Sequence, residues 1–402
     1  MKVKIEIVKN DVSKIEKASV DFLNEDAAKK TLKFHSSFKQ YEETPLVELN
    51  NLSKYLGLKN IFVKDESYRF ELNAFKALGG SYSIGKYIAE RLGKDIDDIS
   101  YDEMISQEIK DKLGDITFIT ATDGNHGRGI AWTCQQLRQK AVVYMPKGSA
   151  LERRDNIKAH GAKCEILDMN YDECVKYAYE ESKRNGYVMI QDTSWEEYED
   201  IPRWIMQGYL TMAYEAYLKL EVRDVIPTHV FLQAGVGAMA AAVTGFLSSI
   251  YGKNKPKITI VEPNKAACIF KTAKIDDGKI HYIKDEMDTI MAGLACGEPV
   301  TIGWDILHSN CENFLSVPDE LSAHGMRVFG NPLKKDERII SGESGAVTLG
   351  VVSYIMQHKE LNHIKKALEL DENSVVLLFS TEGDTYKKGY RDIVWNGKYE
   401  NR

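Results

Sequence analysis

Apolar residues recur along the chain in short blocks that alternate between a strand pattern and a helix pattern. Between residues 117 and 192, blocks rich in Val, Ile, Phe and Tyr alternate with longer segments whose apolar residues recur every three to four positions. Repeated units of this size indicate a mainly parallel sheet covered by helices on both faces. The expected strands are 117–121, 141–146, 163–167 and 187–192, and the expected helices are 129–137, 151–160 and 171–184.

The same alternation continues, in larger pieces, on both sides of this block. Before it, a helix is expected near 20–29, a strand at 61–66 and a helix after Ser81; after it come a helix at 205–220, strands at 229–233, 257–262 and 375–380, and a loop-rich stretch at 271–318. We therefore predict an α/β protein of two domains with mainly parallel sheets flanked by helices. The predicted larger domain is 1–83 with 191–402, and the smaller one is 84–190.

The composition is that of a globular protein, and it limits the kinds of molecule that the protein is expected to bind. The 402 residues are 43% hydrophobic and 10% aromatic, which is ample for a buried core. The net charge of −7 is not gathered into blocks, which argues against a nucleic-acid or anionic-membrane partner. The first residues lack a signal-peptide pattern and no apolar run reaches membrane-spanning length, so a cytoplasmic location is expected.

The six cysteines are scattered and contain no CxxC pair. Neither a zinc site nor a disulfide framework is indicated, and no metal is expected. Buried free thiols are the expected state. The alternative is one bridge between Cys268 and Cys296, which both lie in loop-like sequence.

Lys76 is the first candidate for chemistry, because it stands among Phe75, Ala77 and Leu78 at a strand-to-helix junction. Desolvation there would lower its pKa and favour the nucleophilic amine that a Schiff base needs. The alternative is a lysine on an amphipathic helix whose charged end reaches water.

The second candidate is the loop 234–238, where two glycines stand between a strand and a helix. Backbone N–H groups in such a loop can close on a phosphate, with the helix dipole directed at it. Position 240 is alanine, so the third glycine of a dinucleotide fingerprint is missing. A tight packing turn and a nicotinamide site are the alternatives.

The third candidate is the turn 122–127, in which Asp123, Asn125 and His126 crowd a glycine-rich bend at the start of a helix. Its backbone N–H groups are suited to an anion, and Asn125 adds a side-chain donor. His126 is interpreted as a core histidine. Asp123 is either a helix cap or a catalytic carboxylate.

These motifs occur in the order found in pyridoxal-phosphate enzymes of the tryptophan-synthase β superfamily, known as fold type II, and the chain resembles them over most of its length. Within that superfamily it is most similar to the diaminopropionate ammonia-lyases, through N-A-F-K-A-L-G-G, T-D-G-N-H-G-R-G and the acid Asp192. The segments that carry the resemblance are 73–80, 123–127, 235–239, 341–346 and 379–384.

The resemblance implies a role for each matching position. Lys76 would hold pyridoxal 5'-phosphate as a Schiff base, and Asn125 would bond its 3-oxygen. Ser380 or Thr381 would face the pyridine nitrogen, and Ser344 would line the substrate cavity. The phosphate would be cradled by Gly235, Val236, Gly237, Ala238 and Met239.

Asp123 is the informative departure, because related hydroxyamino-acid dehydratases commonly carry Ser or Thr at that position. A β-amino group leaves as an ammonium and seeks a carboxylate, and Asp123 and Asp192 supply two. We predict α,β-elimination of 2,3-diaminopropionate, of both enantiomers, to pyruvate and two ammonia. The substrate carboxylate would dock at Thr122 to Asn125, Lys76 and Asp123 would take the α-proton from opposite faces, and Asp192 would hold the leaving amine.

The sequence is also compatible with two other functions. One is a threonine or serine dehydratase of the same fold, which shares the cofactor motifs. The other is a non-catalytic nucleotide-binding or amino-acid-binding module. The resemblance also implies a homodimer that acts on a small amino-acid substrate.

Overall fold

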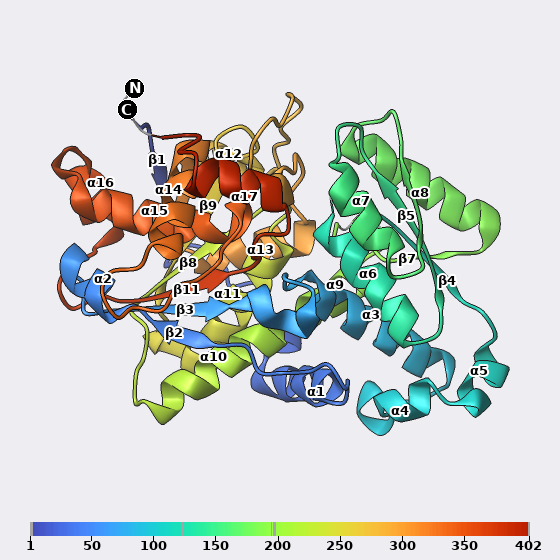
Figure 1. Cartoon of the computed structure of the whole chain (residues 1–402). Coiled ribbons are helices and arrows are strands. Elements are labelled where there is room, and N and C mark those ends of the chain that lie inside the picture. The colour runs from blue at the N-terminus through green and yellow to red at the C-terminus, as the bar shows by residue number, and fades with distance from the viewer. Residues whose placement is uncertain (1–2, 123, 194, 196–197, 401–402) are drawn as a thin grey trace.

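The chain forms two β-sheets, each flanked by helices, as the computed structural model in Figure 1 shows. The structure describes residues 3–122, 124–193, 195 and 198–400. Helices α3 and α9 lie between the two sheets in this view, and α3 packs against both α6 and α9. The two-sheet α/β architecture predicted from the sequence is confirmed.

The larger sheet contains seven strands in the order β1-β10-β9-β8-β11-β3-β2. Its two edge strands, β1 and β2, pair antiparallel with their neighbours, and the other pairs are parallel. The central strands are buried along their whole length, as expected where helices cover both faces. The bounds are β1 Glu6–Lys9, β2 Leu46–Glu48, β3 Asn60–Asp65, β8 His229–Gln233, β9 Lys257–Pro263, β10 Asn313–Val317 and β11 Val375–Ser380.

The smaller sheet contains four parallel strands in the order β6-β5-β4-β7. They are β4 Thr117–Ala121, β5 Lys140–Met145, β6 Lys163–Ile166 and β7 Val188–Met189. Strand β7 is shorter than predicted because the side chain of Gln191 takes over the pairing. Its Oε1 accepts from the backbone N–H of Ala121 at 3.2 Å and from Thr120 Oγ1 at 2.8 Å.

Seventeen α-helices surround the sheets in the described part of the chain. They are α1 Glu25–Ser36, α2 Asn50–Leu56, α3 Lys76–Arg91, α4 Tyr101–Met104, α5 Gln107–Leu113, α6 Asn125–Gln136, α7 Leu151–Lys158, α8 Tyr171–Asn185, α9 Asp200–Gly208, α10 Leu210–Val222, α11 Ala238–Tyr251, α12 Cys268–Ile275, α13 Thr301–Asn310, α14 Asp319–Gly330, α15 Glu343–Gln357, α16 Asn362–Leu368 and α17 Lys387–Val394.

Four further sequence-based expectations differ from this arrangement. The helix expected after Ser81 begins at Lys76, so Ser81 lies inside α3. The first helix begins at Glu25, because the side chain of Asn24 accepts a hydrogen bond from Ala27 N and caps the helix there. The helix expected at 205–220 is divided at Tyr209 into α9 and α10. The stretch 271–318 is more regular than expected, since it contains α13 and the sheet strand β10.

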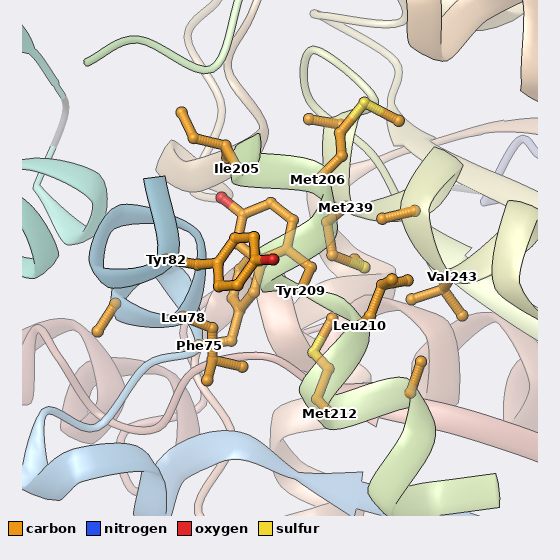
Figure 2. Packing of buried hydrophobic residues seen from close by; sticks show 14 of the residues in the cluster. Phe75, Leu78, Tyr82, Ile205, Met206, Tyr209, Leu210, Met212, Met239 and Val243 are labelled. Carbon is orange, nitrogen blue, oxygen red and sulfur yellow. The ribbon is translucent and has the colours of Figure 1, made fainter. Parts of the chain in front are cut away.

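A buried apolar cluster immobilises the helix that begins with Lys76 (Figure 2). The rings of Phe75 and Tyr209 lie with their centroids 4.8 Å apart. A Cβ on Gly208 would lie 2.5 Å from Leu78 O, so this glycine permits α9 to approach α3 closely. Burying each large apolar side chain contributes about 1.5–3 kcal/mol. The cluster around this contact includes Leu78, Tyr82, Ile205, Met206, Leu210, Met239 and Val243.

The six cysteines, all within the described residues, form no disulfide. Five of the thiols are buried, as predicted, and Cys296 is half-buried; Cys268 and Cys296 are both free. Among the described residues no helix combines the length and apolar character that crossing a bilayer requires. The same residues contain no group of three or more His, Cys, Asp or Glu side chains arranged to hold a metal ion.

Candidate active site

A cavity lies where loops from the two sheets meet, beyond the carboxyl ends of β4, β8 and β11. Ligands of open α/β sheets bind at such strand ends, because the following loops and helix N-termini converge there. Most of the candidate residues from the sequence line this one cavity. They are Lys76, Thr122, Asn125, Asp192, Gly235, Val236, Gly237, Ala238, Met239, Ser344 and Thr381.

Lys76 is the first residue of α3, and its ammonium lies 2.5 Å from Asp192 Oδ2. The side chains are 18% and 5% exposed, so the pair is largely shielded from water. Burial by itself would raise the pKa of Asp192, but the Lys76 ammonium outweighs burial and lowers that pKa to about 2. Burial opposes the charge on Lys76 as well, yet the Asp192 carboxylate raises the lysine pKa above its usual range.

This ion pair corrects one sequence-based expectation. Local desolvation was expected to lower the pKa of Lys76, but that argument considered only the neighbours in sequence. Asp192 lies 116 residues further along the chain and approaches Lys76 only in the folded protein. The site therefore holds an ammonium and a carboxylate in contact, and each stabilises the charged form of the other.

The turn before α6 is fixed by Thr122, whose hydroxyl accepts from the backbone N–H groups of Gly124 at 2.9 Å and Gly127 at 3.1 Å. His126 is 3% exposed and bonds Ile190 O through Nε2 at 2.9 Å. Burial lowers its pKa, which keeps the imidazole neutral. It is a buried core histidine that also lines the cavity. Asp123 lies outside the described residues.

Asn125 opens α6 and donates from Nδ2 to Glu382 Oε2 at 2.6 Å. Glu382 follows β11 directly after Thr381 and also accepts from Ser344 N at 3.0 Å. Sequence reasoning placed Glu382 within a motif but gave it no role. Its position could have identified it, because Glu382 comes one residue after Thr381, a candidate cofactor contact.

The glycine loop joins β8 to α11 and presents bare backbone to the cavity. Gly237 has φ +95°, and a Cβ there would lie 2.9 Å from Ile269 Cδ1. A Cβ on Gly235 would lie 3.1 Å from both Cys296 Sγ and Leu294 Cα. The loop leads into the N-terminus of a 14-residue helix. Bare N–H groups and a helix dipole together form an anion site.

The two hydroxyls after β11 differ in their surroundings. Ser380 is buried, and its hydroxyl donates to Ser341 Oγ at 2.9 Å. Thr381 lines the cavity, and its hydroxyl accepts from Gln233 Nε2 at 2.8 Å. The structure thus distinguishes two residues between which the sequence offered no choice.

The cavity fits pyridoxal 5'-phosphate on three observations. A shielded lysine faces it, the glycine loop offers a phosphate cradle, and several buried polar atoms lining it have no partner within the described residues. These atoms are His126 Nδ1, Gln233 Oε1 and Ser344 Oγ. Buried polar atoms are costly when unsatisfied, so they favour a polar ligand in the cavity.

Replacing Gly237 with alanine should weaken cofactor binding and destabilise the fold. The alanine would have to adopt a left-handed backbone conformation and displace Ile269, at a cost of about 1–3 kcal/mol. Titration with pyridoxal 5'-phosphate and urea unfolding measure the two effects. Gly57→Ala is the matched control, because Gly57 has φ +68° with no atom within 4 Å of an added Cβ. It should lose stability alone, and equal cofactor loss in both variants would contradict the cradle.

The fold and the cavity are those of an α/β enzyme with a site for a phosphate-bearing cofactor. Residues 38–381 match the family model described as "Pyridoxal-phosphate dependent enzyme", and the chain belongs to this family. It is 49% identical over 383 residues to a diaminopropionate ammonia-lyase of Salmonella typhimurium, covering 95% of each chain.

Two crystal structures of the Escherichia coli diaminopropionate ammonia-lyase have closely similar folds. The complex with D-serine superposes with a TM-score of 0.93 at 46% identity, and the complex with an aminoacrylate-PLP azomethine reaction intermediate superposes with a TM-score of 0.91 at 46% identity. Each comparison covers 99% of this chain and 98% of the other. The predicted family, fold type and cofactor are confirmed.

Proposed function

We propose that this enzyme eliminates ammonia from 2,3-diaminopropionate and thereby yields pyruvate and two ammonia. The observation that carries the proposal is the Lys76–Asp192 pair, which brings an ammonium and a carboxylate together at the cavity wall. When bound, pyridoxal phosphate supplies an electron sink for cleavage of the Cα–H bond. The remaining chemistry belongs to the side chains.

Lys76 has two roles in this proposal. It would hold the cofactor through its side-chain nitrogen, and the same nitrogen would take the α-proton of the substrate. The helix position supports both roles, because Lys76 is fixed at the start of α3 by the buried cluster around Phe75 and Tyr209. A base held in one place avoids the entropic cost of finding its proton.

The Asp192 carboxylate balances the positive charge of the amines that take part in the proposed reaction. Its pKa of about 2 keeps it ionised at neutral pH, so it can pair with an ammonium throughout the cycle. The carboxylate would balance the charge of Lys76, once that lysine has taken the α-proton, and the charge of the substrate's β-ammonium. The first ammonia leaves from that position, and the released enamine hydrolyses to pyruvate with loss of the second.

The other cavity residues would bind and orient the cofactor and the substrate. Gly235 to Met239 would hold the phosphate, Asn125 the 3-oxygen and Thr381 the pyridine nitrogen. Between the two predicted hydroxyls, the lining position of Thr381 favours it over Ser380, which is bonded to Ser341. A neutral hydroxyl at the nitrogen does not enforce a protonated ring. The Thr122 turn and Ser344 would receive the substrate carboxylate, since turn N–H groups suit an anion.

Asp123 is proposed as the base for the face of the substrate opposite to Lys76, so that both enantiomers react. In Asp123→Asn, turnover of D-diaminopropionate should fall by about 10²-fold or more, while turnover of the L form falls less. Steady-state kinetics with the two pure enantiomers measure this difference. Equal losses would show that Asp123 binds substrate and is not a face-specific base.

A threonine or serine dehydratase is the rival function of the same fold. A carboxylate placed for an ammonium favours a diamine, because a leaving hydroxyl needs no such partner. Measuring kcat/KM for diaminopropionate, serine and threonine tests the choice. The proposal expects the diamine to be preferred by at least about tenfold, and a preference for either hydroxyamino acid would overturn it. Family membership favours catalysis over a binding module.

The domain division, the homodimer and the cytoplasmic location remain predictions. The division into 1–83 with 191–402 and 84–190 is supported by the two sheets, because all four strands of the smaller sheet fall within 84–190. Its first boundary falls inside α3. Limited proteolysis and sedimentation would test the division and the dimer.

A further inference from the structure

Glu382 connects helices from opposite sides of the cofactor cavity, and none of the roles above uses it. It is 3% exposed and lines the cavity. Its Oε2 accepts from Asn125 Nδ2 at 2.6 Å at the start of α6, and its Oε1 accepts from Ser344 N at 3.0 Å in the first turn of α15. One carboxylate therefore joins a helix that follows the smaller sheet to one that packs on the larger sheet.

The backbone around Glu382 also holds the segment that carries Lys76. Phe75 N donates to Thr381 O at 3.0 Å, and Gly383 N donates to Asn73 O at 3.0 Å. Between these bonds, Ala74 pairs with Glu382 as an isolated antiparallel bridge. The segment that carries Lys76 and the side chain of Asn125 are thus both hydrogen-bonded to the same short stretch after β11.

The chemistry of a carboxylate makes this contact selective. The Oε2 atom of Glu382 accepts this hydrogen bond, so it faces the N–H₂ end of the Asn125 amide. That choice fixes the rotation of the amide and leaves its second N–H available as a donor. We propose that Glu382 is a positioning residue that sets the orientation of Asn125 toward the cofactor and fixes Asn125 relative to Lys76.

Glu343 provides a matched comparison next to this contact. It is a buried carboxyl on the same α15 N-terminus, and burial, reinforced by the charge of Glu382, raises its pKa to about 7. At neutral pH it is partly uncharged, so glutamine is a close mimic. Glu343 forms no part of the contact with Asn125.

The test measures cofactor binding and the visible spectrum of the holoenzyme in the absence of substrate. Glu382→Gln places an amide N–H₂ against donors, and it should weaken affinity for pyridoxal 5'-phosphate by about 10- to 100-fold. Its visible absorption maximum should move in the same direction as in Asn125→Ala. The double variant should have the spectrum of Asn125→Ala, and Glu343→Gln should resemble the wild type.

Unchanged affinity and spectrum in Glu382→Gln would overturn the proposal, as would additive spectral shifts in the double variant or an equal change in Glu343→Gln. If Glu382→Gln does not fold, as judged by circular dichroism, Glu382→Asp takes its place with the same expectations. Failure of both to fold would assign Glu382 to general stability and also overturn it. Because no substrate is used, these outcomes are independent of the preference for diaminopropionate.

Discussion

The Lys76→Ala variant is expected to lose the visible absorption of the lysine-linked cofactor and to lose at least about 10³-fold in kcat. In the proposed mechanism, the substitution removes both the covalent attachment and the base that takes the α-proton. It also leaves the Asp192 carboxylate without the ammonium that lies 2.5 Å away. Absorption spectra of the purified variant and pyruvate formation from diaminopropionate measure the two losses.

Lys86→Ala is the control for this prediction. Lys86 lies on the same helix α3, is 24% exposed and pairs with Glu90 at 3.7 Å. It should keep both the spectrum and the activity, because it lies almost three turns beyond the cavity end of the helix. A Lys76→Ala protein that retained the lysine-type absorption would end the assignment of Lys76.

The Asp192→Asn variant should lose about 10²-fold or more in kcat, since the neutral amide cannot balance the charge of an ammonium. The pKa of Lys76 should fall, because burial would then act on it without the opposing carboxylate. The pH profile of kcat should therefore change shape as well as height. Asp172→Asn is the control, as Asp172 is a half-buried carboxyl on α8.

The same variant makes a prediction about acid stability. The folded pKa of Asp192 is about 2, below its ordinary value of 3.8, so the pair stabilises the fold above pH 3.8 and this stability is lost as the pH falls through 2. From this shift in pKa, Asp192→Asn should be about 1–3 kcal/mol less stable at neutral pH. Urea unfolding of the cofactor-free proteins at several pH values should show the difference shrinking toward pH 2, because only a Lys76 without attached cofactor pairs with Asp192 as an ammonium. A difference independent of pH would contradict the ion pair.

The sequence predicted most of the strand and helix order because the parallel strands are continuous apolar blocks. Thr117–Ala121 and Val375–Ser380 were predicted to the residue or nearly so. The predicted elements differ from the structure where apolar periodicity and local turn signals point to different elements. Tyr209 divides a segment for which the sequence pattern predicts one helix. Asn313–Val317 is a strand within a stretch for which the pattern predicts loops.

The candidate site was predictable as a set of positions but not as a set of contacts. Lys76, Asn125 and the glycine loop were identified from motifs, and all line one cavity. The pairing of Lys76 with Asp192 joins residues 116 positions apart, and the bond from Asn125 to Glu382 joins residues 257 apart. Neither contact leaves a periodic or local signal. The raised pKa of Lys76 therefore had to come from the folded structure.

The most direct test of the proposed reaction is to count both products formed by the purified holoenzyme from L- and D-diaminopropionate. The account predicts pyruvate from both enantiomers, with two ammonia released for each pyruvate. Absence of pyruvate with diaminopropionate, under conditions in which serine or threonine is converted, would contradict it.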